Sequence, residues 1–217
     1  MTKKERYKHV IEYFEQNVLD AETELHYKNP YELAVAVILS AQCTDKRVNM
    51  ITPGFFKQYP EPSGLANANL EDVFKIIKSC SYPNNKARHL IGMAKKICQD
   101  FHGEIPRNIE ELLTIPGIGR KTANVIAAVA FKIPAMPVDT HVFRVTERIG
   151  LSVNSKNPLE TEKQLVKNIP AEKLVKAHHW LILHGRYTCL ARKPKCKDCG
   201  LKLYCKFYEG NKKNIKP

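Results

Sequence analysis

The sequence has 217 residues, enough for one large domain or two small ones with a buried core. Its 35 Lys and Arg against 22 Asp and Glu give a net charge of +13, which favours a polyanionic partner such as a nucleic acid; a basic soluble protein without such a partner is the alternative. No stretch approaches the roughly 18 apolar residues of a membrane span, and no apolar run follows the charged N-terminus as in a secretion signal, so we expect an intracellular protein.

The first predicted elements are helices. Apolar residues at helical spacing indicate an amphipathic helix at residues 7–17. Asn29 and Pro30 suit the N-cap and first turn of a second helix at residues 31–42, which is almost wholly apolar and should be buried. Its end changes abruptly to polar residues, as a helix end in water does, and Thr44 suits the N-cap of a third helix.

Two further helices are predicted on either side of a polar loop. Asn69 can cap the first, in which apolar residues share one face. The second covers residues 87–101 and carries its basic residues on the face opposite the apolar one. The loop between them, residues 80–87, has Lys86 at its exit.

A glycine turn lies between a short helix that Asn108 caps and an alanine-rich helix at residues 122–131. Gly117 and Gly119 allow positive φ and carry no Cβ, so backbone N–H groups of the turn could approach a phosphate at the positive end of the second helix. An ordinary turn is the alternative. Two cations at the mouth of an apolar helix, Arg120 and Lys121, favour the phosphate clamp.

Two prolines in residues 134–137 predict a rigid connector to the next helix. Asp139 stands at its N-cap position, so a structural cap is the ordinary interpretation of this residue, and Gly150 ends the helix. Further helices are predicted at residues 158–168 and 171–184, and the basic tail at residues 211–217 is expected to be disordered. Because no stretch indicates a strand, the predicted fold class is all-α.

Four cysteines are clustered within seventeen residues at the spacing C-x6-C-x2-C-x5-C. They are Cys189, Cys196, Cys199 and Cys205. Four thiols this close can hold a tetrahedral zinc or an iron–sulfur cluster. The single C-x-x-C favours iron–sulfur, since structural zinc sites usually pair two such knuckles.

Four motifs in chain order resemble the endonuclease III family of DNA glycosylases, which are helix-hairpin-helix proteins. They are L-S-A-Q-x-T-D at residues 39–45, the glycine hairpin at residues 113–123, V-D-T-H-V-F-R-V at residues 138–145 and the cysteine spacing. A fifth family pattern fits only in part. In the loop at residues 80–87, Ser81 stands where the family has glycine and Pro83 replaces the second aromatic residue.

The resemblance implies roles for particular residues. Lys121 and Asp139 fall where the family has its catalytic lysine and aspartate. Gln42 would fill the space left by a flipped nucleotide, and Tyr82 is the candidate wedge, a tyrosine packed on its loop being the alternative. The predicted DNA-contacting residues are Gln42, Asp45, Tyr82, Lys86, Pro116, Gly117, Gly119, Arg120, Arg192, Lys193 and Lys195.

By the same resemblance, the four cysteines hold a [4Fe–4S] cluster whose loop presents basic residues to phosphates. The implied fold has two domains, a helical barrel of residues 23–133 that contains the hairpin, and a cluster domain of residues 1–22 plus 134–217.

The implied activity is that of a bifunctional DNA glycosylase and abasic-site lyase of base excision repair. It would remove oxidised pyrimidines from duplex DNA through an imine on Lys121 and then cut the strand by β-elimination. Double-stranded DNA with damaged bases or abasic sites is the expected partner, and we expect a monomer in the cytoplasm, at the nucleoid. The alternatives are an adenine-specific mismatch glycosylase, which Lys121 argues against, and a non-catalytic DNA-binding or electron-transfer iron–sulfur protein, which the pairing of Lys121 with Asp139 argues against.

Overall fold

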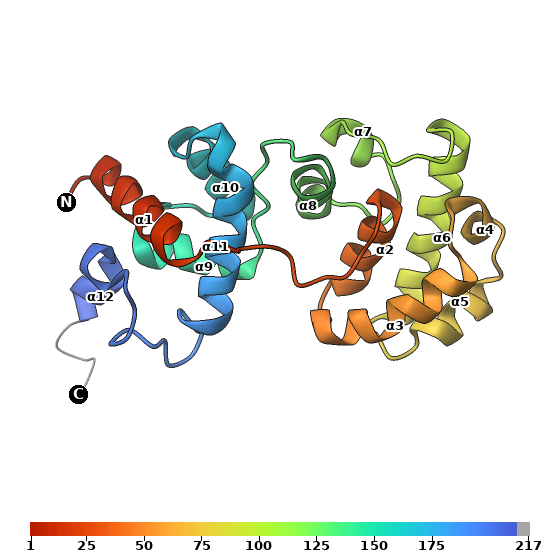
Figure 1. Ribbon diagram of the computed structural model, residues 1–217, viewed down its shortest axis with the longest axis horizontal. Coiled ribbons are helices and arrows are strands. Elements are labelled where there is room, and N and C mark those ends of the chain that lie inside the picture. The colour runs from red at the N-terminus through yellow and green to blue at the C-terminus, as the bar shows by residue number, and fades with distance from the viewer. Residues whose placement is uncertain (212–217) are drawn as a thin grey trace. The chain divides into compact units, whose positions relative to one another are not determined.

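The computed structural model describes residues 1–211, which form helices and no strand, as the all-α prediction requires (Figure 1). Apart from Asn211, the predicted tail lies outside the described residues. No helix within residues 1–211 is both long and apolar enough to cross a membrane. The helices are α1 (Lys3–Asn17), α2 (Pro30–Ser40), α3 (Asp45–Gln58), α4 (Pro62–Ala66), α5 (Leu70–Ile77), α6 (Pro83–Asp100), α7 (Ile109–Leu112), α8 (Arg120–Phe131), α9 (Thr140–Ile149), α10 (Pro158–Asn168), the 3-10 helix η1 (Ala171–Lys173), α11 (Leu174–Tyr187), the 3-10 helix η2 (Lys202–Tyr204) and α12 (Lys206–Asn211).

The predicted helix starts are confirmed by hydrogen bonds. In each case a short polar side chain accepts a hydrogen bond from a backbone N–H of the first turn, which would otherwise lack a partner. The caps are Asn29, Thr44, Asn69, Asn108 and Asp139. Helix α1 begins earlier than predicted, because Thr2 and Glu5 form a reciprocal capping box.

Helix α2 ends at Ser40, two residues before the predicted end. Gln42 has a φ of +54°, which no α-helix contains, so the chain turns there before α3. Helix α6 likewise begins at Pro83, directly after Tyr82 in the same left-handed region with a φ of +55°.

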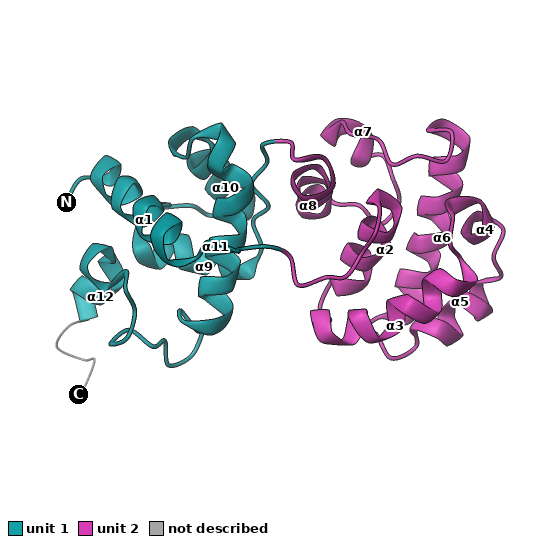
Figure 2. Ribbon diagram, in the orientation of Figure 1, with its two compact units in different colours: residues 1–22, 134–217 teal, residues 23–133 magenta. Residues whose placement is uncertain are grey.

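The chain divides into two compact units (Figure 2). Residues 23–133 form one of them. Its core centres on α2, in which every residue from Tyr31 to Leu39 is buried. Helices α3, α6 and α8 all pack against α2, which is therefore enclosed by three neighbours.

Residues 1–22 and 134–217 make up the other unit. Helix α1 contributes Tyr7, Val10 and Phe14 to a core that contains Trp180 of α11. The Phe14 and Trp180 rings stack with their centroids 5.7 Å apart, and the Trp180 Nε1–H donates to the carbonyl oxygen of Val18 at 2.8 Å. These contacts join the start of the chain to its C-terminal part. The two units have the bounds of the two predicted domains, and their identity as domains stays a prediction.

Candidate active site and cysteine pocket

The hairpin between α7 and α8 depends on Gly117. Its φ is +81°, and a Cβ added there would lie 2.7 Å from the Cβ of His89 on α6, so neither the backbone conformation nor the space suits another residue. The positive φ expected of Gly119 is wrong. Gly119 is the N-cap of α8 with an extended φ of −87°, and a Cβ there would meet no atom within 4 Å. Gly119 is exposed, so its backbone is open to a ligand, and Pro116 is an exposed residue as well.

Lys121 is the second residue of α8 and is half-buried, while Arg120 before it is exposed. The first turn of a helix has a positive potential because its N–H groups point outward. No side chain caps this turn. Lys121 therefore begins its side chain at the positive end of α8.

Two left-handed corners in the same unit present the candidate DNA-inserting residues. Gln42 is exposed on the turn after α2, and Tyr82, at the start of α6, is 62% exposed. The Ser81 hydroxyl donates to the carbonyl oxygen of Gln42 at 2.6 Å, so the two corners are bonded to each other. Sequence reasoning treated Ser81 only as a departure from the family pattern, although a hydroxyl in place of glycine was itself a signal. Nearby, Asp45 is the half-buried first residue of α3, after its Thr44 cap.

Lys86, one of the predicted DNA-contacting residues, is buried, so its DNA contact stays a prediction that the structure does not favour. Its side chain lies in the interior with only 5% of the residue exposed. The ammonium donates to the carbonyl oxygens of Leu39 at 2.8 Å and Ala41 at 2.7 Å. These carbonyls stand at the end of α2, where intrahelical donors run out, so Lys86 satisfies the helix end instead of facing a ligand.

Asp139, in the other unit, uses its two carboxylate oxygens differently. Oδ1 accepts hydrogen bonds from the backbone N–H groups of His141 at 2.9 Å and Val142 at 2.8 Å. Oδ2 lies 3.2 Å from the His141 Nδ1. The connector before it is held by a 3.0 Å contact between the Pro137 carbonyl oxygen and the His178 ring. Asp139 thus caps α9 through Oδ1, whereas Oδ2 takes no part in the cap. Its side chain is 21% exposed.

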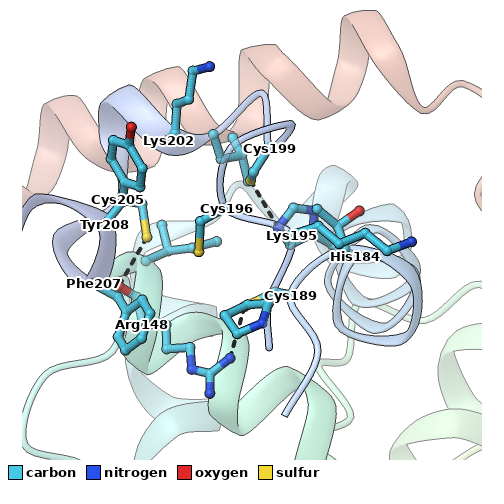
Figure 3. A pocket seen from close by; sticks show the side chains of 14 residues that line it. Arg148, His184, Cys189, Lys195, Cys196, Cys199, Lys202, Cys205, Phe207 and Tyr208 are labelled. Atoms are coloured by element: carbon cyan, nitrogen blue, oxygen red, sulfur yellow. Dashed lines mark hydrogen bonds between the residues drawn. The ribbon is translucent and has the colours of Figure 1, made fainter. Parts of the chain in front are cut away.

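The four clustered cysteines line one pocket, together with residues of α9, α11 and the C-terminal turns (Figure 3). Figure 3 shows their sulfur atoms around a common space, with Cys189 from the end of α11 and the other three from the loop and turn that follow. Cys189, Cys199 and Cys205 also pack against the core that contains Trp180. Within residues 1–211, no three His, Cys, Asp or Glu side chains converge as the ligands of a single metal ion do.

Charged and polar donors from α9 and α11 hold this loop. The Arg148 guanidinium donates to the Leu190 carbonyl oxygen at 2.7 Å and to the Cys189 Sγ at 3.5 Å. The His184 Nε2 lies 3.7 Å from the Cys199 Sγ. Spacing along the sequence could not reveal these contacts, because they join residues 15 to 42 positions apart.

Burial controls the ionisation of these groups. It raises the pKa of the Cys199 thiol to about 11 and also raises the pKa of Cys196 and Cys205 above the ordinary value. It lowers the pKa of His184 to about 4, so that imidazole is neutral at pH 7. A thiol must lose its proton to bind a metal, so metal binding in this pocket would release protons.

The basic residues of the cysteine loop are on the surface. Arg192, Lys193 and Lys195 are all exposed, and Lys193 has a φ of +50°. The first cysteine loop therefore presents three cations to solvent next to the pocket, as expected for a phosphate-contacting loop.

Comparison with known proteins assigns the chain to a family. Residues 35–171 match the HhH-GPD superfamily of base excision DNA repair proteins, which is more than half of the chain. This chain belongs to that superfamily. The matched region of the HhH-GPD protein includes the hairpin, Lys121 and Asp139 and ends before the cysteine cluster.

Relatives place it more closely within the HhH-GPD superfamily. The chain is 45% identical to endonuclease III of Rickettsia prowazekii over 199 residues, which cover 92% of this chain and 93% of the relative. It is 45% identical to endonuclease III of Bacillus subtilis over 196 residues, covering 90% and 89% of the two chains. A solved structure of a trapped covalent intermediate between endonuclease III and DNA superposes with a TM-score of 0.93 at 40% identity, covering 98% of this chain and all of the other.

This HhH-GPD protein is therefore a member of the endonuclease III family, and the helix-hairpin-helix glycosylase fold is confirmed. The predicted class of activity, a DNA glycosylase with abasic-site lyase activity in base excision repair, is confirmed with it.

Proposed function

We propose that this enzyme removes oxidised pyrimidines from duplex DNA, with Lys121 as the nucleophile and Asp139 as the stabilising carboxylate. The observation that carries the proposal is the place of Lys121, half-buried in the first turn of α8 directly after a glycine hairpin. The trapped covalent intermediate with DNA seen for a relative of this family supports a covalent mechanism.

The Lys121 amine attacks C1′ of the extruded nucleotide, and the base leaves with the electron pair of the glycosidic bond. Loss of the amine proton and opening of the sugar ring then give an imine between Lys121 and the sugar. Removal of a proton from C2′ expels the 3′ phosphate and cuts the strand. Extrusion costs a few kcal/mol, less for a damaged base, which contributes to selectivity.

The mechanism requires Lys121 to be a free amine. An ordinary lysine has a pKa of about 10.4, so roughly one molecule in a thousand is unprotonated near pH 7.4. The positive end of α8 and the neighbouring Arg120 both act against the ammonium form. We infer that the helix start activates the nucleophile.

The Asp139 carboxylate would stabilise the positive charge that develops on the sugar. Its Oδ1 is occupied by two backbone N–H groups, which fixes the direction of the side chain. Its Oδ2 lies 3.2 Å from the His141 Nδ1, and a carboxylate oxygen has further lone pairs that can face a proton or a cation.

Borohydride trapping tests the nucleophile. Wild type incubated with a duplex that contains an oxidised pyrimidine should give a covalent adduct and a strand cut, whereas a G·A mismatch duplex should give neither. Lys121→Gln should bind an abasic-site duplex but give no adduct, because an amide cannot form the imine. Lys132→Gln, which changes an exposed lysine at the other end of α8, is the matched control and should be trapped like wild type. An adduct from Lys121→Gln would move the nucleophile to another amine.

The four cysteines are proposed to hold a [4Fe–4S] cluster. They fit such a group because all four line one pocket. The thiolates of a zinc site all lie about 2.3 Å from one ion, whereas those of a cluster bind different irons and can lie further from one another. The cluster would supply a rigid cross-link of the C-terminal loop. Iron and sulfide analysis of the purified protein tests this, with about four of each expected; stoichiometric zinc in a colourless protein would contradict it.

The exposed cations of the cysteine loop and the hairpin amides are proposed to hold the phosphates of double-stranded DNA. We further propose that the enzyme acts as a monomer in the cytoplasm, at the nucleoid, where that substrate is found. Sedimentation of the free protein and of its DNA complex tests the monomer.

A further inference from the structure

Two loops that are 39 residues apart in sequence meet at the Ser81–Gln42 hydrogen bond. One is the turn from α2 to α3, and the other is the loop from α5 to α6 (Figure 1). Each places one exposed side chain at a left-handed corner, Gln42 with a φ of +54° and Tyr82 with a φ of +55°. Non-glycine residues adopt this conformation at a cost of roughly 1 kcal/mol or more, so neighbouring contacts must hold both corners.

Side chains of Ser81 and Lys86 provide that hold through three hydrogen bonds. The Ser81 hydroxyl bonds the Gln42 carbonyl at 2.6 Å. The Lys86 ammonium donates hydrogen bonds to the carbonyl oxygens of Leu39 and Ala41, which lie in the segment of backbone directly before Gln42. Burial raises the pKa of the Cys80 thiol to about 11, and the adjacent Cys43 adds to that rise, so the residues flanking the two corners are also neighbours.

Lys86 links the second corner as well. Its backbone N–H donates to the Tyr82 carbonyl oxygen at 3.1 Å in the first turn of α6. One buried residue therefore bonds the end of α2 through its side chain and the start of α6 through its backbone. Charged donors make the stronger hydrogen bonds, and a buried ammonium would be costly if these two carbonyls moved away.

We infer that Ser81 and Lys86 are positioning residues that hold Gln42 and Tyr82 as one rigid two-pronged unit for insertion into the DNA base stack. This inference rests on the proposed function, in which Gln42 and Tyr82 contact DNA. A pre-formed pair does not have to be ordered on binding, so more of the binding energy is available to extrude the nucleotide.

A double-mutant cycle tests the coupling. The rate of strand cutting in a single turnover on a duplex with one oxidised pyrimidine is measured for wild type, Ser81→Ala, Gln42→Ala and the double variant. Ser81→Ala should slow cutting about fivefold to tenfold, the equivalent of one net hydrogen bond. In the Gln42→Ala background the same change should slow cutting by a smaller factor than in wild type, because only Tyr82 then remains to be positioned.

Conservative and control variants separate positioning from folding. Ser81→Thr keeps the hydroxyl and should restore most of the rate, and Ser63→Ala, an exposed serine in α4, should behave like wild type. Lys86→Met removes both side-chain hydrogen bonds and should slow cutting further; if it does not fold, the Ser81 cycle decides. As a direct readout, 2-aminopurine placed opposite an abasic site should change its fluorescence less on binding Ser81→Ala than on binding wild type.

Three experimental outcomes would overturn different parts of this inference. Equal slowing by Ser81→Ala in both backgrounds would overturn the positioning role and leave the proposed function intact. Wild-type rates for both Gln42→Ala and Tyr82→Ala would overturn the two-pronged unit, while the Lys121 chemistry would stand. A wild-type protein that neither cuts the duplex nor forms an adduct would overturn the inference and the proposed function together.

Discussion

Asp139 shows how one side chain can serve both a fold and a reaction. Its Oδ1 caps α9 through two backbone N–H groups, and its Oδ2 lies beside the His141 ring. A cap needs only an acceptor atom, whereas stabilising a cationic transition state needs the full negative charge. The two roles therefore respond differently to substitution.

Asp139→Asn should keep the cap and lose the charge. We expect its free energy of unfolding to change by a few tenths of a kcal/mol, whereas Asp139→Ala should lose about 0.5–2 kcal/mol with the cap. Turnover should fall by a factor of about a hundred or more in both variants. Urea denaturation and single-turnover assays on the same preparations measure the two effects. If Asp139→Asn turned over like wild type, Asp139 would be a cap only.

Among the elements, the hairpin contains two glycines with different physical requirements. Gly117 needs its positive φ and its close approach to His89, which are requirements of the folded chain itself. Gly119 has an ordinary φ and open space around it, so only a ligand that approaches its backbone would require glycine there.

Gly117→Ala should destabilise the protein by about 1–3 kcal/mol, through the strained φ and the overlap with His89. Gly119→Ser should leave the unfolding free energy nearly unchanged, since serine is a good N-cap and its Cβ meets no atom within 4 Å. Its affinity for an abasic-site duplex should nevertheless fall, because the side chain obstructs the phosphate. Thermal unfolding and fluorescence anisotropy measure the two quantities. Unchanged affinity for Gly119→Ser would place the phosphate elsewhere.

At the scale of the whole molecule, the net charge of +13 favours binding to DNA, and the number of phosphates that the protein neutralises sets the salt dependence of that binding. The logarithm of the binding constant should fall linearly with the logarithm of the salt concentration. Lys193→Ala should reduce the steepness of that line by about 0.9 if Lys193 neutralises one phosphate. Preference among damaged bases should not change. An unchanged slope with an altered base preference would show that Lys193 is no phosphate contact.

The proposed cluster should stabilise the unit of residues 1–22 and 134–217 more than the unit of residues 23–133. Cys189, Cys199 and Cys205 pack against the core that contains Trp180, the only tryptophan of the chain, which is 2% exposed. Removing the metal with a chelator and an oxidant should therefore shift Trp180 fluorescence to longer wavelength. Backbone amides of α2 and α8, in residues 23–133, should keep their protection from hydrogen exchange. Equal loss of protection in both units would show that they unfold together and would contradict the two-domain prediction.

The sequence by itself determined the helix starts, the hairpin, the spacing of the four cysteines and the family, because these depend on residues close together along the chain. Asn29, Thr44 and Asp139 act on backbone groups within three residues, so their caps could be predicted from local sequence. Only the tertiary structure decided the end of α2, where Lys86 bonds carbonyls 45 and 47 residues away, and the bond from Ser81 to Gln42. It also gave Gly119 an extended φ. The reason is that the hydrogen-bond partner of a buried lysine or hydroxyl depends on the packing of the folded chain. The local sequence does not indicate which distant backbone carbonyl will lack a donor.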